Sequence, residues 1–229
     1  MKFLIVKKRS LIFALIVIVI FSSCFATYFS VRPASSPKPK YSIVIDAGHG
    51  GIDGGAVGRE SGITESELNL RYAKQLEKLC LDVGIEVVMT RSDMNGLYDE
   101  NASNRKKSEM EKRKEIINSS GADCLVSIHM NSFPVESCNG AQIFYCKGSQ
   151  EGFRFAKSVQ EVVCQNFSNA RNYVTAGDYF VLNNSNIPAI LIECGFLTNP
   201  NEEISLIDEK YCEKFCYSIL AGIMSYFEM

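Results

Sequence analysis

The chain contains only two histidines, and each of them follows an apolar segment that is typical of a buried strand. His49 stands in IVIDAGHGG and His129 in LVSIHMNS. Imidazole is the commonest metal ligand in proteins, and the carboxyl ends of parallel strands lie at one edge of a sheet, where sites form. A single histidine is more often structural, but two histidines at such strand ends predict a shared metal site.

A carboxylate near these strand ends would complete the site, and the segment GITESELNL contains two glutamates. Thr64 and Glu67 have the spacing of a capping box, which gives Glu67 a structural role at the start of a helix. Glu65 is then free to reach the metal, although its alternative role is to stabilise the helix dipole as an acidic residue at an N-terminus. Two histidines and one carboxylate form an open zinc set that leaves one position for water.

Hydrolysis at such a metal also requires a group that accepts and donates a proton. Glu193 in PAILIECGFL follows a strongly apolar strand and precedes a glycine turn. A charged group in this position needs a physical reason, and catalysis is one. The alternative is a buried ion pair with an arginine such as Arg91 or Arg105. We predict that Glu193 is the catalytic base or acid.

These side chains need a framework, and the sequence alternates between strand and helix patterns. Strands are predicted at residues 42–46, 85–90, 124–129, 141–146 and 189–194, and helices at residues 65–83, 151–166 and 209–227, with a further charged helix that ends near Asn118. This order predicts a single α/β domain. We expect a mostly parallel twisted sheet with helices on both faces and the zinc site at the carboxyl ends of the strands.

The composition, with 46% hydrophobic and 22% charged residues among 229, is typical of a globular protein. The net charge of −2 averages over two different regions. The first 40 residues carry seven basic residues and no acidic one, whereas the remaining 189 carry 17 basic and 26 acidic residues, a net charge of −9. A domain with that charge has no basic field for phosphate groups, so we expect no nucleic-acid partner.

The basic N-terminal region has the parts of an export signal: the residues KKR, an apolar segment and then small residues. We therefore assign residues 1–30 to an N-terminal signal or membrane anchor, residues 31–40 to a Pro/Ser linker and residues 41–229 to the catalytic domain. The basic side of the anchor is expected in the cytoplasm and the domain outside. Cleavage of the signal and lipidation at Cys24 stay open, and a buried core helix is the alternative.

Nine cysteines in an exported chain would ordinarily suggest disulfides. Cys80, Cys124 and Cys194 lie within apolar segments, where cysteine acts as a small buried hydrophobic residue. The pair Cys138 and Cys146 is the one candidate for a bridge.

Four separated motifs, DAGHGGIDGGAVG, GxxExxxNL, SIHMNS and PAILIECGFLTNP, resemble the zinc-dependent N-acetylmuramoyl-L-alanine amidases of the type-3 family. The resemblance covers nearly all of residues 41–229. It implies Zn²⁺ held by His49, Glu65 and His129, with Glu193 as the catalytic residue. The implied reaction cleaves the amide between the lactyl group of N-acetylmuramic acid and L-alanine of the stem peptide, so peptidoglycan is the expected partner.

This chain departs from the family at two points, with Glu65-Ser66 in place of the usual Glu-Lys and Asp46-Ala47 in place of Asp-Pro. The segments HMNSFP and GAQIFY and the stretch around Tyr179 are similar to the sporulation branch, whose germination-specific amidases prepare spore cortex. That similarity implies a location between the forespore and mother-cell membranes. The alternatives are a vegetative autolysin, a metal-dependent peptidase or deacetylase acting on another wall bond, and a non-catalytic wall-binding protein. The need for an accessory protein stays open.

Overall fold

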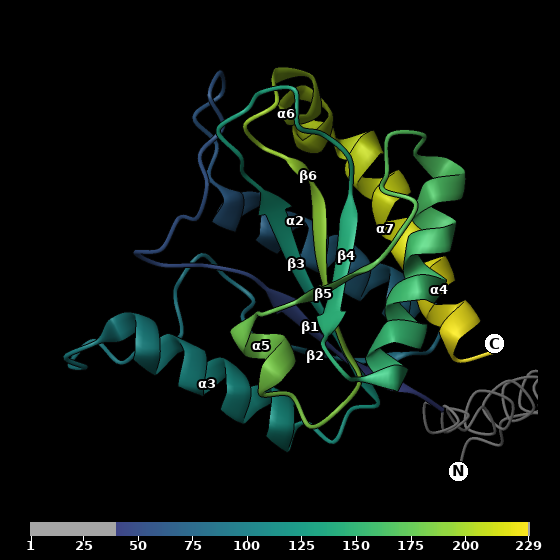
Figure 1. Ribbon diagram of the computed structural model, residues 1–229. Coiled ribbons are helices and arrows are strands. Elements are labelled where there is room, and N and C mark those ends of the chain that lie inside the picture. The colour runs from purple at the N-terminus through teal and green to yellow at the C-terminus, as the bar shows by residue number, and fades with distance from the viewer. Residues whose placement is uncertain (1–39, 229) are drawn as a thin grey trace, which may run out of the picture. The chain divides into compact units, whose positions relative to one another are not determined.

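The computed structural model describes residues 40–228, which fold around one six-stranded sheet (Figure 1). The strands are β1 (Ser42–Ala47), β2 (Glu86–Met89), β3 (Cys124–Asn131), β4 (Gln142–Cys146), β5 (Thr175–Gly177) and β6 (Ala189–Phe196). Their order across the sheet is β2-β1-β3-β6-β4-β5. The first four of these are parallel to one another, and β4 runs antiparallel to β6. The mostly parallel sheet predicted from the sequence is therefore confirmed.

Helices cover both faces of this sheet, as predicted (Figure 1). The helices are α2 (Glu65–Asp82), α3 (Arg105–Ser119), α4 (Gln150–Asn166), α5 (Phe180–Asn183), α6 (Pro200–Ile207) and α7 (Glu209–Tyr226). Side chains of α2, α4 and α7 form the larger hydrophobic core on one face. Those of α3 and α5 form a smaller core on the other face. Because side chains alternate along a strand, Ile43 and Ile45 pack into the larger core and Val44 into the smaller one.

Three short elements were not predicted. β5 has three residues and α5 has four, too few for a periodic pattern to reveal them. α6 begins after Asn199, whose side chain accepts hydrogen bonds from the amides of Asn201 and Glu202, with proline in the first turn. The sequence predicts a glycine turn directly after Glu193, but Gly195 belongs to β6, and the chain turns into α6 only after Phe196.

The predictions for the N-terminal region concern residues that the structure does not describe. The signal or anchor predicted at residues 1–30, nearly all of the linker predicted at 31–40, and Cys24 lie outside the described residues. Within residues 40–228 no helix is long and apolar enough to cross a membrane.

Cys138 and Cys146 are both free thiols, so the one candidate disulfide is not formed.

A buried ion pair lies beneath the carboxyl end of β1. Asp46 and Arg113 of α3 are both almost fully buried and contact each other through Oδ1 and Nη1. Thr90 and Ser127 each donate a hydrogen bond of 2.7 Å to the Asp46 carboxylate. Burial acts to raise the pKa of Asp46, but Arg113 and the two hydroxyl groups lower it to about 2. Both oxygens of the Asp46 carboxylate therefore accept hydrogen bonds.

This lowered pKa gives the stability a defined pH dependence. A carboxylate whose folded-state pKa lies below its ordinary value of 3.8 contributes stability above that value. The contribution disappears as the pH falls toward about 2. Arg113 also donates to the backbone carbonyls of Ala47 and His49, so the same pair supports the loop that begins at His49.

We expect Arg113→Met to lower the free energy of unfolding by about 3–5 kcal/mol at neutral pH, because it leaves the buried carboxylates of Asp46 and Glu109 without their shared partner. Urea unfolding followed by circular dichroism measures this loss, which should shrink as the pH falls from about 4 to 2. Lys112→Met, which removes an exposed pair with Glu115 on the same helix, should change the value by less than about 1 kcal/mol. Equal effects of the two substitutions would contradict the role given to Asp46.

Candidate metal centre

The structure brings the three predicted metal ligands together at the carboxyl ends of β1 and β3. The Glu65 Oε1 atom lies 3.1 Å from His49 Nε2 and 2.9 Å from His129 Nδ1. One donor atom from each residue lies within 4.8 Å of the other two. Glu65 is 5% exposed, whereas the two rings are partly open to solvent. The group therefore forms a partly open cluster that could hold a metal ion.

The start of α2 and its surroundings hold the Glu65 carboxylate in place. Thr64 and Glu67 form the predicted capping box, which fixes the first turn of the helix. Glu65 Oε2 accepts a hydrogen bond of 2.9 Å from the amide of Ala56, and Oε1 accepts one of 3.2 Å from the amide of Met130. Burial acts to raise the pKa of Glu65, but hydrogen bonds to His129 and His49 hold it well below its usual value.

The turn after β1 depends on small residues next to His49. The backbone of His49 has φ of +60°, a left-handed conformation that few side chains adopt without cost. At Gly48 an added Cβ would lie 2.2 Å from Cε1 of His129, so any other residue would displace that ring. The His129 ring consequently packs directly against the Gly48 backbone, and its centroid lies 5.0 Å from that of His49.

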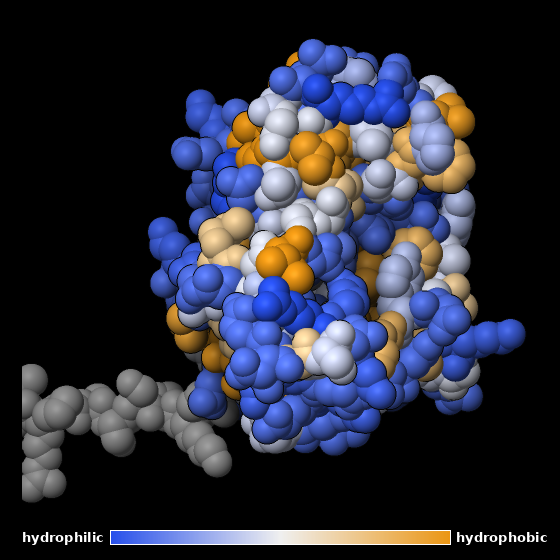
Figure 2. Space-filling view, turned by 90° about the vertical axis from the view of Figure 1, so that its left-hand side faces the viewer, coloured by the Kyte–Doolittle hydropathy of each residue, from blue (hydrophilic) through white to orange (hydrophobic). Residues whose placement is uncertain are grey.

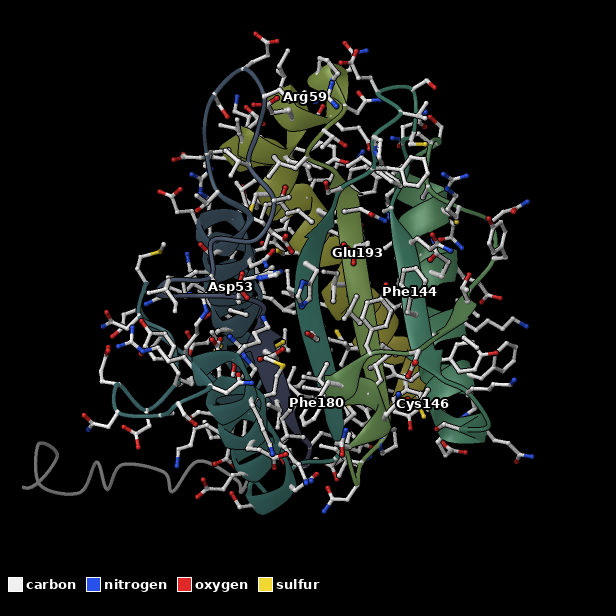
Figure 3. All side chains as sticks on the ribbon, turned by 60° about the vertical axis from the view of Figure 1, so that its left-hand side comes forward. Asp53, Arg59, Phe144, Cys146, Phe180 and Glu193 are labelled. Carbon is white, nitrogen blue, oxygen red and sulfur yellow. The ribbon has the colours of Figure 1, made fainter. Side chains whose placement is uncertain are left out.

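Glu193 lies on β6 beside this cluster. It pairs with His129 of β3 on one side and with Gln142 of β4 on the other, so the three side chains share one face of the sheet. In Figure 3 Glu193 is central, between Asp53 of the loop after β1 and Phe144 of β4, with Phe180 of α5 below. Glu193 is only 8% exposed, and its Oε2 atom has no hydrogen-bond partner.

The electrostatic surroundings of Glu193 favour its neutral form more than usual. Burial raises its pKa to about 7, although the charges of His129 and His49 oppose the rise. The ion pair considered as its alternative role is not formed. Arg91 donates to backbone carbonyls, including those of Ala47 and Gly48, and Arg105 pairs with Glu100. These contacts leave Glu193 available for proton transfer.

A small cavity of about 110 Å³ adjoins the cluster on the α3 and α5 side of the sheet. His49, His129, Tyr179 and Leu191 contribute to its lining. The Tyr179 ring packs edge-on against Phe144, with centroids 5.1 Å apart, and burial together with the charge of Glu193 raises its pKa to about 12. Figure 2 shows this side as a mostly hydrophilic surface interrupted by separate hydrophobic groups.

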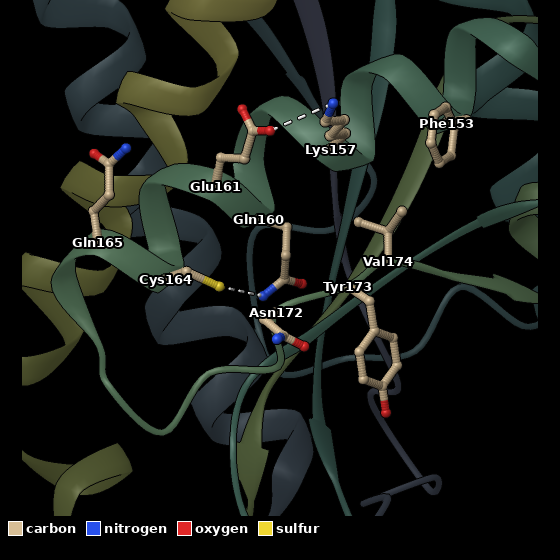
Figure 4. A pocket seen from close by; sticks show the side chains of 9 residues that line it. All are labelled: Phe153, Lys157, Gln160, Glu161, Cys164, Gln165, Asn172, Tyr173 and Val174. Atoms are coloured by element: carbon tan, nitrogen blue, oxygen red, sulfur yellow. Dashed lines mark hydrogen bonds and ion pairs between the residues drawn. The ribbon is translucent and has the colours of Figure 1, made fainter.

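A larger cavity of about 440 Å³ lies elsewhere, between α4 and the segment before β5 (Figure 4). Its lining contains none of the four predicted site residues. The Gln160 side chain in its wall is already engaged: it accepts from the amide of Ile143 and donates to the carbonyl of Arg171. The Gln160 side chain therefore has a structural role in the wall of this cavity.

Two polar residues that support the site through hydrogen bonds were not identified from the sequence. Asn69, one turn after Glu65, donates to Glu65 Oε1 and to the carbonyl of Gly48. Arg91 donates to the carbonyls of Gly48 and Ser66, so it joins the turn after β1 to the start of α2. Asn69 had a visible signal, because the i, i+4 spacing places it on the same side of the helix as Glu65. Arg91 had none, since its partners are backbone atoms.

The donor set suits zinc, because two imidazole nitrogens and a carboxylate oxygen form the ligand set of many hydrolytic zinc sites. The Glu193 Oε2 atom, on the strand next to that of His129, is buried without a hydrogen-bond partner in the described part of the chain.

Comparisons with known proteins identify the family. The family model described as N-acetylmuramoyl-L-alanine amidase matches residues 43–225. The germination-specific N-acetylmuramoyl-L-alanine amidase of Bacillus subtilis is 35% identical over 217 residues, which cover 93% of this chain and 91% of that protein. The CwlD amidase from Clostridioides difficile, solved in complex with the GerS lipoprotein, superposes with a TM-score of 0.79 at 38% identity, covering 82% of this chain and 98% of that one. The chain therefore belongs to the N-acetylmuramoyl-L-alanine amidase family.

Proposed function

We propose that this amidase is zinc-dependent, that His49, Glu65 and His129 hold the zinc ion, and that Glu193 is its catalytic residue. The reaction is hydrolysis of the amide that joins the lactyl group of N-acetylmuramic acid to L-alanine of the stem peptide. The observation that supports this best is the buried and unpaired Glu193 carboxylate next to three converging donor atoms. A module that only bound the wall would gain nothing from this combination.

Zinc, when bound, would act as a Lewis acid that polarises the substrate carbonyl and lowers the pKa of water. Glu193 accepts the proton of the attacking water and then donates it to the leaving amine of alanine. A group that performs both transfers needs a pKa close to the working pH. Burial raises the pKa of Glu193 toward that range.

Glu65 and its donors perform a different task in this proposal. The amides of Ala56 and Met130 and the side chain of Asn69 keep the Glu65 carboxylate charged and fixed in position. A ligand held in this way loses little conformational freedom when the metal binds. The His49 and His129 side chains are 21% and 18% exposed, so a metal held by these residues would be open to water and substrate.

We also propose a role in the maturation of spore cortex. The germination-specific relative from Bacillus subtilis, matched over 93% of this chain, supports this role. A vegetative role is the alternative, and the probable cell wall amidase LytH of Staphylococcus epidermidis, 30% identical over 85% of this chain, favours it to a lesser degree. Export by residues 1–30 would place the domain outside the cytoplasm, with the membrane contact through that segment. The complex of CwlD with a lipoprotein supports an accessory protein for this chain as well.

We expect Glu193→Gln to bind zinc normally and to release stem peptides from peptidoglycan at least about 10²-fold more slowly, because the amide cannot carry the proton. Mass spectrometry of the digested muropeptides measures the release and also identifies the bond, since only an amidase yields free stem peptides. Glu161→Gln, an exposed carboxylate on α4, is the matched control and should retain full activity. Normal release by Glu193→Gln would exclude the proposed role.

We expect His129→Ala to bind zinc far more weakly, because one of three protein ligands is removed. Zinc titration of the metal-free chain in competition with a chromogenic chelator measures this loss. Glu193→Gln serves as the comparison, since it alters the same site without removing a proposed ligand. Unchanged zinc affinity in His129→Ala would remove this residue from the ligand set.

We expect spores of a strain lacking this chain to contain no muramic δ-lactam in their cortex. In the proposed role in cortex maturation, the amidase removes the stem peptide from muramic acid, and this removal must precede formation of the lactam. Reintroduction of the wild-type chain should restore the lactam, and reintroduction of Glu193→Gln should not. Muropeptide analysis of purified spores measures it. Normal lactam content combined with a defect in vegetative cell separation would instead favour the alternative role.

A further inference from the structure

His49 has a second carboxylate neighbour in addition to Glu65. Asp53 Oδ1 lies 3.0 Å from His49 Nδ1, whereas His49 Nε2 faces Glu65. The two atoms are close enough for a hydrogen bond, but their geometry does not form one, and the buried Nδ1 atom has no other hydrogen-bond partner among the described residues. The imidazole is therefore contacted through both nitrogens, one on the side of the proposed metal and one on the outer side.

Three sets of contacts hold Asp53 in this position. Its backbone forms a tight two-way bridge with Gly50, with N···O distances of 2.9 and 3.1 Å. Its Oδ1 atom accepts from the amide of Gly55 at 3.2 Å. Its Oδ2 atom forms an ion pair with Lys106 in the first turn of α3. The two carboxylate oxygens thus have different tasks, since one contacts the imidazole and the other is tethered to a helix.

We propose that Asp53, tethered by Lys106, is a positioning residue that orients His49 for zinc binding. This inference rests on the proposed function, because it takes His49 as a zinc ligand. A carboxylate that contacts the outer nitrogen of a ligating imidazole favours one tautomer, restricts the ring orientation and makes the ligand more basic. Asp53 contacts the atom that such a partner requires.

The two proposed histidine ligands differ in how much support they need. His129 belongs to β3, where sheet pairing fixes its backbone, and its ring packs against Gly48. His49 lies in a loop with a left-handed backbone, so neither a strand nor a helix directs its side chain. Among the described residues, Asp53 contacts His49 but not His129. The outer carboxylate is therefore present at the ligand whose backbone is less constrained.

The same contacts also allow a simpler role, in which Lys106 and Asp53 only stabilise the surface loop. The Lys106 side chain is 57% exposed and that of Asp53 is 27% exposed, and such pairs contribute little to stability. The two roles predict different results. If the pair only stabilises the loop, its loss should leave the zinc affinity unchanged and shift the unfolding temperature of the metal-free chain slightly at most. If Asp53 positions His49, its loss should weaken zinc binding while the unfolding temperature stays nearly the same.

The experiment measures the zinc dissociation constant of the full-length chain by titration in competition with a chromogenic chelator. We expect Asp53→Ala to weaken zinc binding about 10- to 100-fold, and Lys106→Met to weaken it to a smaller extent. The matched controls are Asp93→Ala, a loop aspartate that caps its own turn, and Lys107→Met, a neighbouring lysine on α3. Both controls should retain the wild-type affinity.

Two further measurements separate positioning from folding and from substrate binding. The thermal unfolding midpoint of metal-free Asp53→Ala should stay close to that of the wild type. Excess zinc should restore most of its amidase activity, because the defect concerns retention of the metal. An unchanged dissociation constant in Asp53→Ala would overturn this inference and leave the proposed function intact. Failure of the wild-type chain to bind zinc would overturn the proposed function itself.

Discussion

The site depends on a single buried carboxylate, because Glu65 Oε1 contacts both imidazoles and also accepts hydrogen bonds from the chain. This oxygen can reach all of its partners only if three segments far apart in sequence end at the same place. The capping box fixes where α2 begins, β3 supplies His129, and the left-handed turn after β1 supplies His49. A shift in any one segment would leave a buried charge without its partners, at a large cost in free energy.

A second network of buried charged residues supports the turn after β1 that contains His49. Asp46 and Arg113 satisfy each other inside the smaller core, and Arg113 and Arg91 together donate to the carbonyls of Ala47, Gly48 and His49. A turn with left-handed residues leaves backbone carbonyls that no strand or helix can pair. Guanidinium groups suit this task because each presents several donors in a fixed plane. The fold therefore uses two arginines as backbone supports, at a point where regular hydrogen bonding ends.

The sequence was sufficient to predict the sheet, most of the helices and the meeting of four site residues, because each of these follows from a local pattern. The strand patterns predicted the neighbourhood of His49, His129 and Glu193, and spacing along α2 separated Glu65 from Glu67. β3 and β6 run further than predicted, to Asn131 and Phe196, so His129 and Glu193 lie within strands. The partners of charged residues were not predictable in this way. Arg113 is one of several charged residues on a highly charged helix, and only the tertiary structure shows that it is the buried one. β5, α5 and α6 were missed because they are short and depend on capping and edge pairing.

The helices cover the two sheet faces differently, and His129 and Glu193 share the face on which α3 packs. Three long helices fill the face opposite, so a polar residue pointing there would be buried in the larger core. The other face has one long helix and the four-residue α5. β6 is buried along its whole length, whereas the His129 side chain near the end of β3 is 18% exposed. Glu193 pairs with His129 from the neighbouring strand, and its burial raises its pKa to about 7. A buried carboxylate without a hydrogen-bond partner opposes folding, whereas the hydrogen bonds to Glu65 and Asp46 act in the opposite direction, and stability and activity often conflict in this way at functional sites.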